Sequence, residues 1–179
     1  GAPFDVFLAA DEHRPDKLIA EGKATEKLSL TYAIGKLVLI SNIKHDKTCR
    51  DVLDSPALKR LAIANPKTAP YGFAAQQTLE KLQHWTTIKP KLVTGENIAQ
   101  TLQFVSTGNA NAGFVAKSIL LKDTKINTSC EWEVPSYMHD PIKQKMIVLK
   151  KSSNKSAANA FWQYMQTEDV KTIIKNNGY

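Results

Sequence analysis

The amino-acid sequence predicts an α/β fold, and two patterns along the chain support that prediction. Short apolar runs typical of buried strands recur at residues 4–10, 37–40, 61–64, 91–93, 112–115 and 145–149. Segments with apolar residues at helical spacing lie between or after them, at residues 71–82, 98–105, 154–165 and 168–176. Strands that alternate with helices in this way indicate a largely parallel sheet with helices packed against it.

The composition limits the classes of function. The chain has 179 residues, 42% hydrophobic and 23% charged, which is ordinary for a globular protein with a sizeable core. A net charge of +7 favours anionic partners, but the basic residues are dispersed and form no dense cluster with aromatic residues, so nucleic-acid binding is not expected. The two cysteines, Cys49 and Cys130, fit no metal-ligand pattern. They are either a disulfide or two free thiols, and the sequence does not distinguish these alternatives.

The first third of the chain opens directly on a strand. Residues 4–10 are followed by a short helix at 16–22, which begins after a proline and stops at a glycine. The strand at 37–40 comes next. Residues 41–56 are interpreted as a polar loop, and residues 57–60 as a turn of helix before the central strand.

The stretch from residue 60 to residue 82 joins a buried strand to an amphipathic helix. Asn65 and Pro66 end the apolar run, and the helical pattern starts at Tyr71. A helix N-terminus carries unpaired N–H groups and the positive end of the helix dipole, so it is a natural anion site. The alternative interpretation is a strand-to-helix turn that binds nothing.

The following segment repeats this arrangement. A connector at 85–90 and a short strand at 91–93 lead into an amphipathic helix at 98–105, for which Thr94 and Asn97 offer capping groups. After the strand at 112–115 we expect a short helix, an irregular segment, a final strand and two C-terminal helices. They lie at residues 118–121, 130–140, 145–149, 154–165 and 168–176.

The sequence offers no enzyme motif. It contains no G-x-S-x-G, no Walker lysine loop and no G-x-G-x-x-G. Asp11 and Glu12 follow a strand end without an acid–base partner, and are interpreted as a turn-forming or solvated pair. The histidines lack metal-ligand spacing, so a surface or loop position is expected for each of His13, His45, His84 and His139. The chain is therefore not expected to be an enzyme, and no cofactor or bound metal is implied.

Several segments, taken in order, resemble a known family. They are GAPFDVFLAAD, LAIANPKTAPYGFAAQQTLEKL, HWTTIKPKLVTGENIAQTLQFV, GNANAGFV, YMHDPIKQKMIVLK and AFWQYMQTEDVKTIIKNNGY. They resemble the periplasmic molybdate-binding proteins of ABC transporters, which have the two-lobed periplasmic binding protein type 2 fold. The resemblance covers the chain from Gly1 to Tyr179. Its most specific parts are the Gly-Ala-Pro-x-Asp-Val-Phe opening, the Pro-x-Gly helix start and the closing Asn-Gly-Tyr.

The resemblance implies two lobes joined by hinge strands. The chain would cross to lobe two near residues 35–40 and return near residues 141–148. Lobe one would comprise residues 1–35 and 142–179, and lobe two residues 36–141. In that family an oxyanion is held in the cleft between the lobes by neutral hydrogen-bond donors, and lobe closure is the signal that the transporter recognises.

The same resemblance implies a function. The chain would be the substrate-binding component of an ABC transporter, capturing molybdate, tungstate or a similar tetrahedral oxyanion in the periplasm. Its protein partner would be the membrane permease of that transporter. A second interpretation keeps the fold and changes the role: a ligand-sensing module, such as the effector domain of a regulator, that binds another small anion.

Three positions match the anion ligands of the family. One backbone donor falls on Tyr71, at the Pro-x-Gly helix start, and a second falls on Ile98, at the start of the next helix. The tyrosine hydroxyl of the family falls on Ala116, whose side chain has no donor, so the sequence departs from the family pattern there. Two alternatives follow: a nearby hydroxyl, such as that of Tyr71 or Ser118, replaces it, or the site accepts a different anion.

The sequence also starts later than the family pattern. In the family, a first strand and two loops with serine ligands precede the Gly-Ala-Pro opening. Without them lobe one would be incomplete at its N-terminus, with an unpaired sheet edge and exposed apolar faces. For a chain of 179 residues we then expect weak anion binding or none, and an oligomer or strand exchange that covers the edge.

Overall fold

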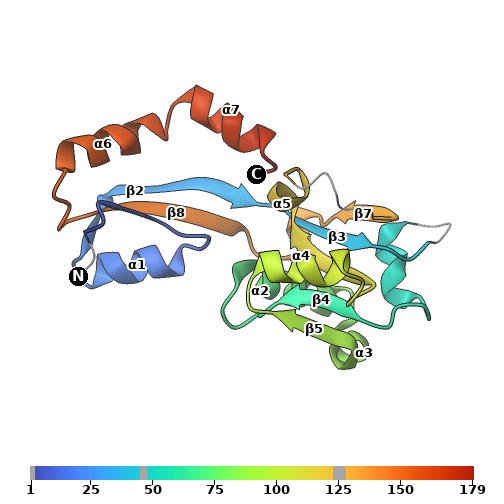
Figure 1. Cartoon of the computed structure of the whole chain (residues 1–179). Helices are drawn as coiled ribbons and strands as arrows, with labels where there is room; N and C mark the ends of the chain where they lie inside the picture. The colour runs from blue at the N-terminus through green and yellow to red at the C-terminus, as the bar shows by residue number, and fades with distance from the viewer. Residues whose placement is uncertain (1–2, 45–47, 123–127) are drawn as a thin grey trace. The chain divides into compact units, whose positions relative to one another are not determined.

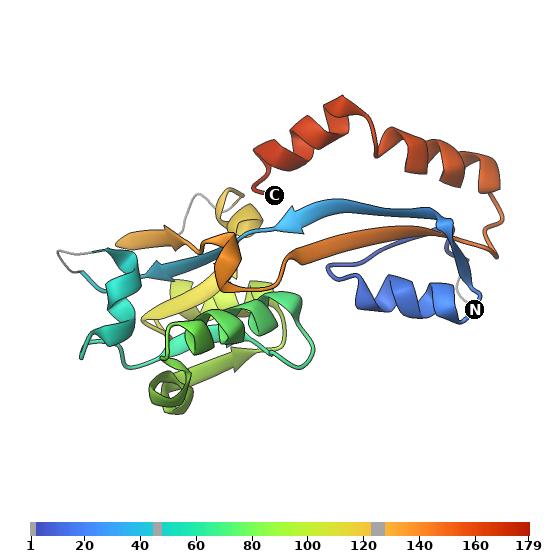
Figure 2. The same cartoon turned by 180° about the vertical axis from the view of Figure 1, so that it is seen from behind.

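The structure, a computed structural model, describes residues 3–44, 48–122 and 128–179. Figures 1 and 2 show the chain from opposite sides. The chain divides into two compact units. Unit 1 comprises Gly1–Ile34 and Ile142–Tyr179, and unit 2 comprises Gly35–Pro141.

Unit 1 is built on a three-stranded sheet in the order β1-β8-β2. Its elements are β1 (Val6–Leu8), α1 (His13–Ala20), β2 (Ala24–Gly35), β8 (Ile142–Leu149), α6 (Lys155–Tyr164) and α7 (Glu168–Asn176). Strand β1 runs antiparallel to β8, with Phe7 opposite Ile147. Within this unit α1 lies on one side of the sheet, and α6 and α7 lie on the other (Figures 1 and 2).

A buried lysine joins three elements of unit 1. Lys145 of β8 is 9% exposed, and its Nζ donates hydrogen bonds to Asp16 of α1 at 2.7 Å and to Glu26 of β2 at 3.2 Å. Burial alone lowers the pKa of Lys145, but the hydrogen bonds to the two carboxylates outweigh burial and raise that pKa above its usual value. The charged ammonium therefore holds α1 against the sheet.

Unit 2 is built on a five-stranded mixed sheet in the order β5-β4-β6-β3-β7. Its strands are β3 (Leu37–Ser41), β4 (Leu61–Ala64), β5 (Leu92–Gly95), β6 (Ala112–Ala116) and β7 (Cys130–Glu133). Strand β4 is parallel to β5 and β6, whereas β3 is antiparallel to β6 and β7. Four of the five strands therefore run in the same direction, as expected for a largely parallel sheet, and β3 runs the opposite way. The sequence did not predict this reversed strand, because residue periodicity shows which segments are strands but not their direction.

Two helices cover opposite faces of this sheet. Helix α4 (Ile98–Ser106) lies in front of the sheet in Figure 1, and α2 (Pro70–Lys81) lies in front in Figure 2. Leu102 and Val105 of α4 pack in a buried cluster with strand residues of one face, among them Ala62 and Val115. Successive residues of a strand point to opposite faces of the sheet. The residues directly before and after Ala62 and Val115 in their strands therefore point toward α2.

Several element boundaries differ from those predicted. Helix α1 begins at His13 rather than Asp16, because the Asp11 carboxylate accepts a hydrogen bond from the Arg14 N–H at 2.9 Å. Asp11 is thus turn-forming, as expected. Residues 57–60 form no helix, because Asn111 Oδ1 accepts hydrogen bonds from two backbone N–H groups there, those of Lys59 and Arg60.

Three further segments contain structure that was not predicted. The polar loop at 41–56 includes the 3-10 helix η1 (Cys49–Asp54), and the connector at 85–90 includes α3 (Trp85–Ile88), followed by η2 (Lys89–Lys91). The irregular segment at 130–140 contains β7 and η3 (Ser136–Met138). Short elements of this kind carry too few residues for a periodic pattern to show.

A disulfide resolves the alternatives left open for the cysteines. Cys49 of η1 is bonded to Cys130 of β7, across a sequence separation of 81 residues, with the two Cα atoms 5.4 Å apart. The Cys49 side chain is buried against β3, with its sulfur near the Leu39 carbonyl oxygen. The bond joins η1 to the edge strand of the unit 2 sheet.

Candidate functional site

The three sequence-predicted site positions lie at one edge of the unit 2 sheet. Strands β4, β5 and β6 are parallel, so their carboxyl ends point the same way. Tyr71 and Ile98 are in the first turns of α2 and α4, the helices that follow β4 and β5, and Ala116 is the last residue of β6. In open α/β sheets, ligands bind outside the carboxyl ends of the strands. We call this region the carboxyl edge.

The turn before α2 is fixed by Asn65. Its N–H donates to the Gly95 carbonyl oxygen at 2.8 Å, which joins the ends of β4 and β5 directly. Its own carbonyl oxygen accepts from the N–H groups of Thr68 and Ala69, and its Oδ1 accepts from that of Lys67. This turn places the start of α2 beside the start of α4. The sequence marked Asn65 only as a strand breaker.

Gly72 allows the first turn of α2 to approach the strand that precedes it. A Cβ atom at this position would lie 2.1 Å from the Ala64 carbonyl oxygen, a separation that no side chain tolerates. Tyr71, beside it, is 6% exposed, so its N–H belongs to a helix start that is packed closely against β4. The Pro-x-Gly pattern seen in the sequence thus has a steric cause.

At the start of α4, side chains accept hydrogen bonds from some backbone N–H groups and leave others without an acceptor. The Asn97 side chain accepts a hydrogen bond from the Gln100 N–H at 2.9 Å, as the sequence predicted, whereas Thr94 is not the cap. The Gln100 side chain in turn accepts from the Glu96 N–H at 2.6 Å. The N–H groups of Ile98 and Ala99 have no acceptor among the described residues. Such amides, at the positive end of the helix dipole, are suited to bind an anion.

Ala116 has only a methyl side chain, so it offers no side-chain hydrogen-bond donor at the carboxyl edge. It is 2% exposed, and the Lys117 N–H that follows it donates to the Lys36 carbonyl oxygen at 3.0 Å. Ser118, one of the two hydroxyls considered as a replacement for the family tyrosine, is also buried. The donors identified at this edge are therefore neutral backbone amides, with the hydroxyls of Tyr71 and Ser118 as side-chain candidates.

The histidines that the structure describes are not grouped as metal ligands. Within residues 3–44, 48–122 and 128–179, no group of His, Cys, Asp and Glu side chains is placed to hold a metal ion. His84 lies 3.5 Å from Asp54. His139 lies in the loop between η3 and β8, but its side chain is buried there, and its Nδ1 forms a hydrogen bond with the Asp140 carbonyl oxygen at 2.7 Å. His45 lies outside the described residues.

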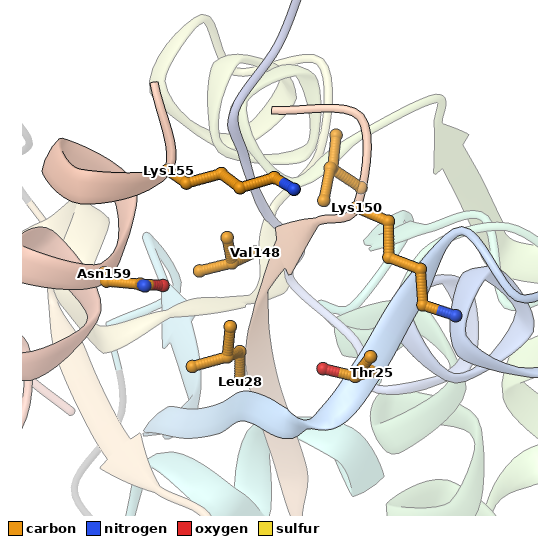
Figure 3. Close-up of a pocket in the computed structure, with 7 residues that line it drawn as sticks. Thr25, Leu28, Val148, Lys150, Lys155 and Asn159 are labelled. Carbon is orange, nitrogen blue, oxygen red and sulfur yellow. The ribbon is translucent and has the colours of Figure 1, made fainter. Parts of the chain in front are cut away.

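Two cavities of unit 1 share no residue with the carboxyl edge. One, of about 390 Å³, has Leu28 and Val148 in its wall, and Lys155 extends over Val148 (Figure 3). The other, of about 460 Å³, lies between the end of β2 and α7 and includes Tyr32. Burial, together with the nearby Tyr179, raises the pKa of Tyr32 to about 12, so this phenol is neutral at physiological pH.

This fold defines a class of protein. Two α/β units, one of which directs the N-termini of two helices to the carboxyl edge of its sheet, are the architecture of a solute-binding protein. The chain belongs to the bacterial extracellular solute-binding protein family, whose model matches residues 1–179. Members of this family are binding proteins and not enzymes. No described helix has the length and apolarity that crossing a membrane requires.

Relatives and solved structures agree with this family. The chain is 47% identical over 182 residues to the molybdate-binding protein ModA of Azotobacter vinelandii, covering 100% of this chain and 71% of the relative. It is 41% identical over 179 residues to ModA of Rhodobacter capsulatus, covering 100% and 70%. The solved periplasmic molybdate-binding protein of Azotobacter vinelandii matches it with a TM-score of 0.88 at 33% identity, covering 100% and 79%. The family resemblance seen in the sequence is confirmed.

Proposed function

We propose that this protein is the substrate-binding component of an ABC transporter and that it captures molybdate at the carboxyl edge of unit 2. The observation that carries the proposal is the pair of N–H groups of Ile98 and Ala99, which have no acceptor among the described residues at the positive end of α4. The two relatives that are molybdate-binding proteins favour molybdate among the tetrahedral oxyanions.

The finer assignments rest on the same proposal. Tungstate matches molybdate in charge and nearly in size, so we propose that it binds equally well. The N–H groups of Tyr71 and Ile98 would be donors to the anion, with Ala116 beside them contributing no side-chain ligand. Neutral donors suit a dianion that must be released again, because a fully desolvated ion pair is costly to assemble and to break.

The family and the disulfide support proposals for the location and the protein partner. The Cys49–Cys130 disulfide favours an oxidising compartment, of which the periplasm is one. We propose the periplasm as the location and the membrane permease of the transporter as the protein partner. We also propose that the two units correspond to lobe one, residues 1–35 and 142–179, and lobe two, residues 36–141. The cleft between the lobes stays a prediction from the resemblance.

Exposed apolar side chains support a further proposal about association. Most of the large exposed apolar residues belong to unit 1, namely Phe4, Leu8, Ile34, Phe161, Tyr164 and Ile173. Strands β1 and β2 are both at the ends of the sheet of unit 1. We propose that the 179-residue chain covers these surfaces by forming an oligomer or by strand exchange. Light scattering should show a mass above 19.9 kDa, and a monomer at micromolar concentration would contradict this.

Isothermal titration of the full-length protein with four anions tests the function. Molybdate and tungstate should bind with similar affinity, and at least about tenfold more tightly than sulfate or phosphate, a difference of about 1.4 kcal/mol. No heat with any of the four would overturn the proposal and would favour a ligand-sensing module for another small anion. Equal affinity for all four would mean that the edge does not select molybdate.

A further inference from the structure

One face of α2 holds the segment that precedes β8. Gln77 Nε2 donates a hydrogen bond to Asp140 Oδ2 at 2.6 Å, and the Asp140 N–H donates to Gln77 Oε1 at 2.9 Å. One helical turn further on, Lys81 Nζ donates to the Tyr137 carbonyl oxygen. The amide nitrogen and the amide oxygen of Gln77 therefore both form hydrogen bonds with Asp140, which fixes the orientation of the two residues.

The segment held in this way has little freedom of its own. His139 is buried and its ring forms a hydrogen bond with the Asp140 carbonyl oxygen. Pro141 follows, with a φ angle that its ring restricts, and β8 begins at Ile142. The contact of Gln77 with Asp140 therefore joins α2 to the point where the chain leaves unit 2.

The neighbouring glutamine shows that this contact is specific to one face of the helix. Gln76 Nε2 donates to Glu80 Oε1 at 2.7 Å, so its amide is used within α2 and not on the segment at 137–140. Gln76 and Gln77 are the same residue type at adjacent positions of one helix. They provide a matched pair for experiment.

We propose that Gln77 and Asp140 are positioning residues for anion binding, an inference that rests on the proposed function. Tyr71 precedes Gln77 by less than two helical turns, about 9 Å along the axis, and a helix moves as a rigid body over that length. The pair therefore fixes the N-terminus of α2 at the carboxyl edge. An anion that restricts the motion of this N-terminus would, through the same contact, also restrict the motion of Asp140 just before β8.

The physical basis is linkage between two events on one helix. An anion bound at the first turn of α2 restricts the motion of that helix, which strengthens the contact of Gln77 with Asp140. If the contact is removed, the anion alone must order the helix, and affinity falls by the cost of that ordering. The effect of the anion on the contact and the effect of the contact on anion affinity are reciprocal, so either one can be measured to detect the linkage.

The experiment uses the full-length protein with molybdate as the probe, and compares the wild type with Gln77→Ala and Gln76→Ala. In the wild type, molybdate should slow the hydrogen exchange of the Asp140 N–H about tenfold. In Gln77→Ala this N–H should exchange rapidly with or without molybdate, and the dissociation constant should rise roughly five- to tenfold. Gln76→Ala should match the wild type in both measurements. Asp140→Asn, which keeps an acceptor for Gln77 Nε2, should retain most of the wild-type affinity.

The outcomes separate this inference from the proposed function. If the wild type does not bind molybdate, both are overturned. If it binds, but Gln77→Ala has the affinity of Gln76→Ala, or molybdate leaves the exchange of the Asp140 N–H unchanged, the positioning role is overturned and the proposed function stands. Should Gln77→Ala fail to fold, Asp140→Ala removes the carboxylate from the other side and should give the same loss of affinity.

Discussion

The N–H groups of Ile98 and Ala99 are available because two nearby side chains satisfy other amides. Asn97 accepts from Gln100, and Gln100 accepts from Glu96. The sequence predicts the Asn97 cap, since asparagine before an apolar helical pattern is a common helix start. It does not predict the contact of the Gln100 side chain with Glu96, because glutamine has no preference that marks this role. At residue scale, the sequence therefore predicts which helix start carries the proposed donor amides, but not which individual N–H groups remain without an acceptor.

Ile98→Pro should weaken molybdate binding about tenfold or more, because it removes one N–H donor to a charged oxygen. Proline is well tolerated at the first helical position, and Asn97 already has the extended conformation, φ −150° and ψ 173°, that precedes a proline. Titration calorimetry measures the effect. Ile98→Ala is the control, because it loses the same packing but keeps the N–H. Equal affinities of the two variants would exclude Ile98 as a donor.

Tyr71→Phe distinguishes the two groups that Tyr71 could present to an anion. The variant keeps the backbone N–H and loses the hydroxyl, so we expect its affinity for molybdate to stay within about twofold of the wild type. A loss of more than tenfold would instead assign the hydroxyl as the replacement for the family tyrosine absent at Ala116. The same titration on Ser118→Ala tests the other hydroxyl.

At the scale of elements, segments with a clear apolar pattern were predicted well, and edge strands and short irregular segments were not. Helix α7 has the predicted bounds because its apolar residues keep helical spacing over its whole length, and strand β4 because its four residues form an uninterrupted buried apolar run. Strand β2 was missed, although Leu28, Leu30, Tyr32 and Ile34 alternate with other residues as in a half-buried strand. The antiparallel direction of β3 depends on long-range pairing that no local pattern records.

Gly72→Ala should reduce the free energy of unfolding by about 3 kcal/mol or more, because the new Cβ would meet backbone atoms that cannot move aside. Chemical denaturation followed by circular dichroism measures this. The control is Phe73→Ala in the same helical turn, where the side chain is 48% exposed and the loss should stay below about 1 kcal/mol. Similar losses in both variants would mean that α2 does not approach β4 as closely as described.

Reduction of the Cys49–Cys130 bond should destabilise unit 2 by about 2–5 kcal/mol, because the bond closes a long loop in the unfolded chain. Denaturation with and without a thiol reductant measures the difference. The double variant Cys49→Ala/Cys130→Ala should have the stability of the reduced protein and should not respond to reductant. An unchanged midpoint on reduction of the wild type would show that the bond does not constrain the unfolded state.

At the scale of the whole molecule, the positive charge and the carboxyl edge predict different responses to anions. A net charge of +7 attracts every anion, in proportion to its charge and with strong sensitivity to salt. Aligned amides at helix starts select by size and by the absence of protons on the anion. The composition therefore predicts an anionic partner, and only the arrangement of α2 and α4 predicts a specific one.

Ligand-linked stability separates these two responses. At a concentration one hundred times its dissociation constant, molybdate should stabilise the native protein by about 2.7 kcal/mol, which raises the melting temperature by about 5–10 °C for a protein of this size. Sulfate at the same concentration and ionic strength should produce a much smaller shift, and Ile98→Pro should reduce the shift caused by molybdate. Equal shifts for both anions would indicate general screening of the positive charge rather than a site.

If the two units melt separately, the family resemblance predicts that molybdate raises the melting temperatures of both transitions, since each lobe would contribute ligands. A shift confined to the transition of unit 2 would place the whole binding energy in that unit, where the amides of α2 and α4 lie.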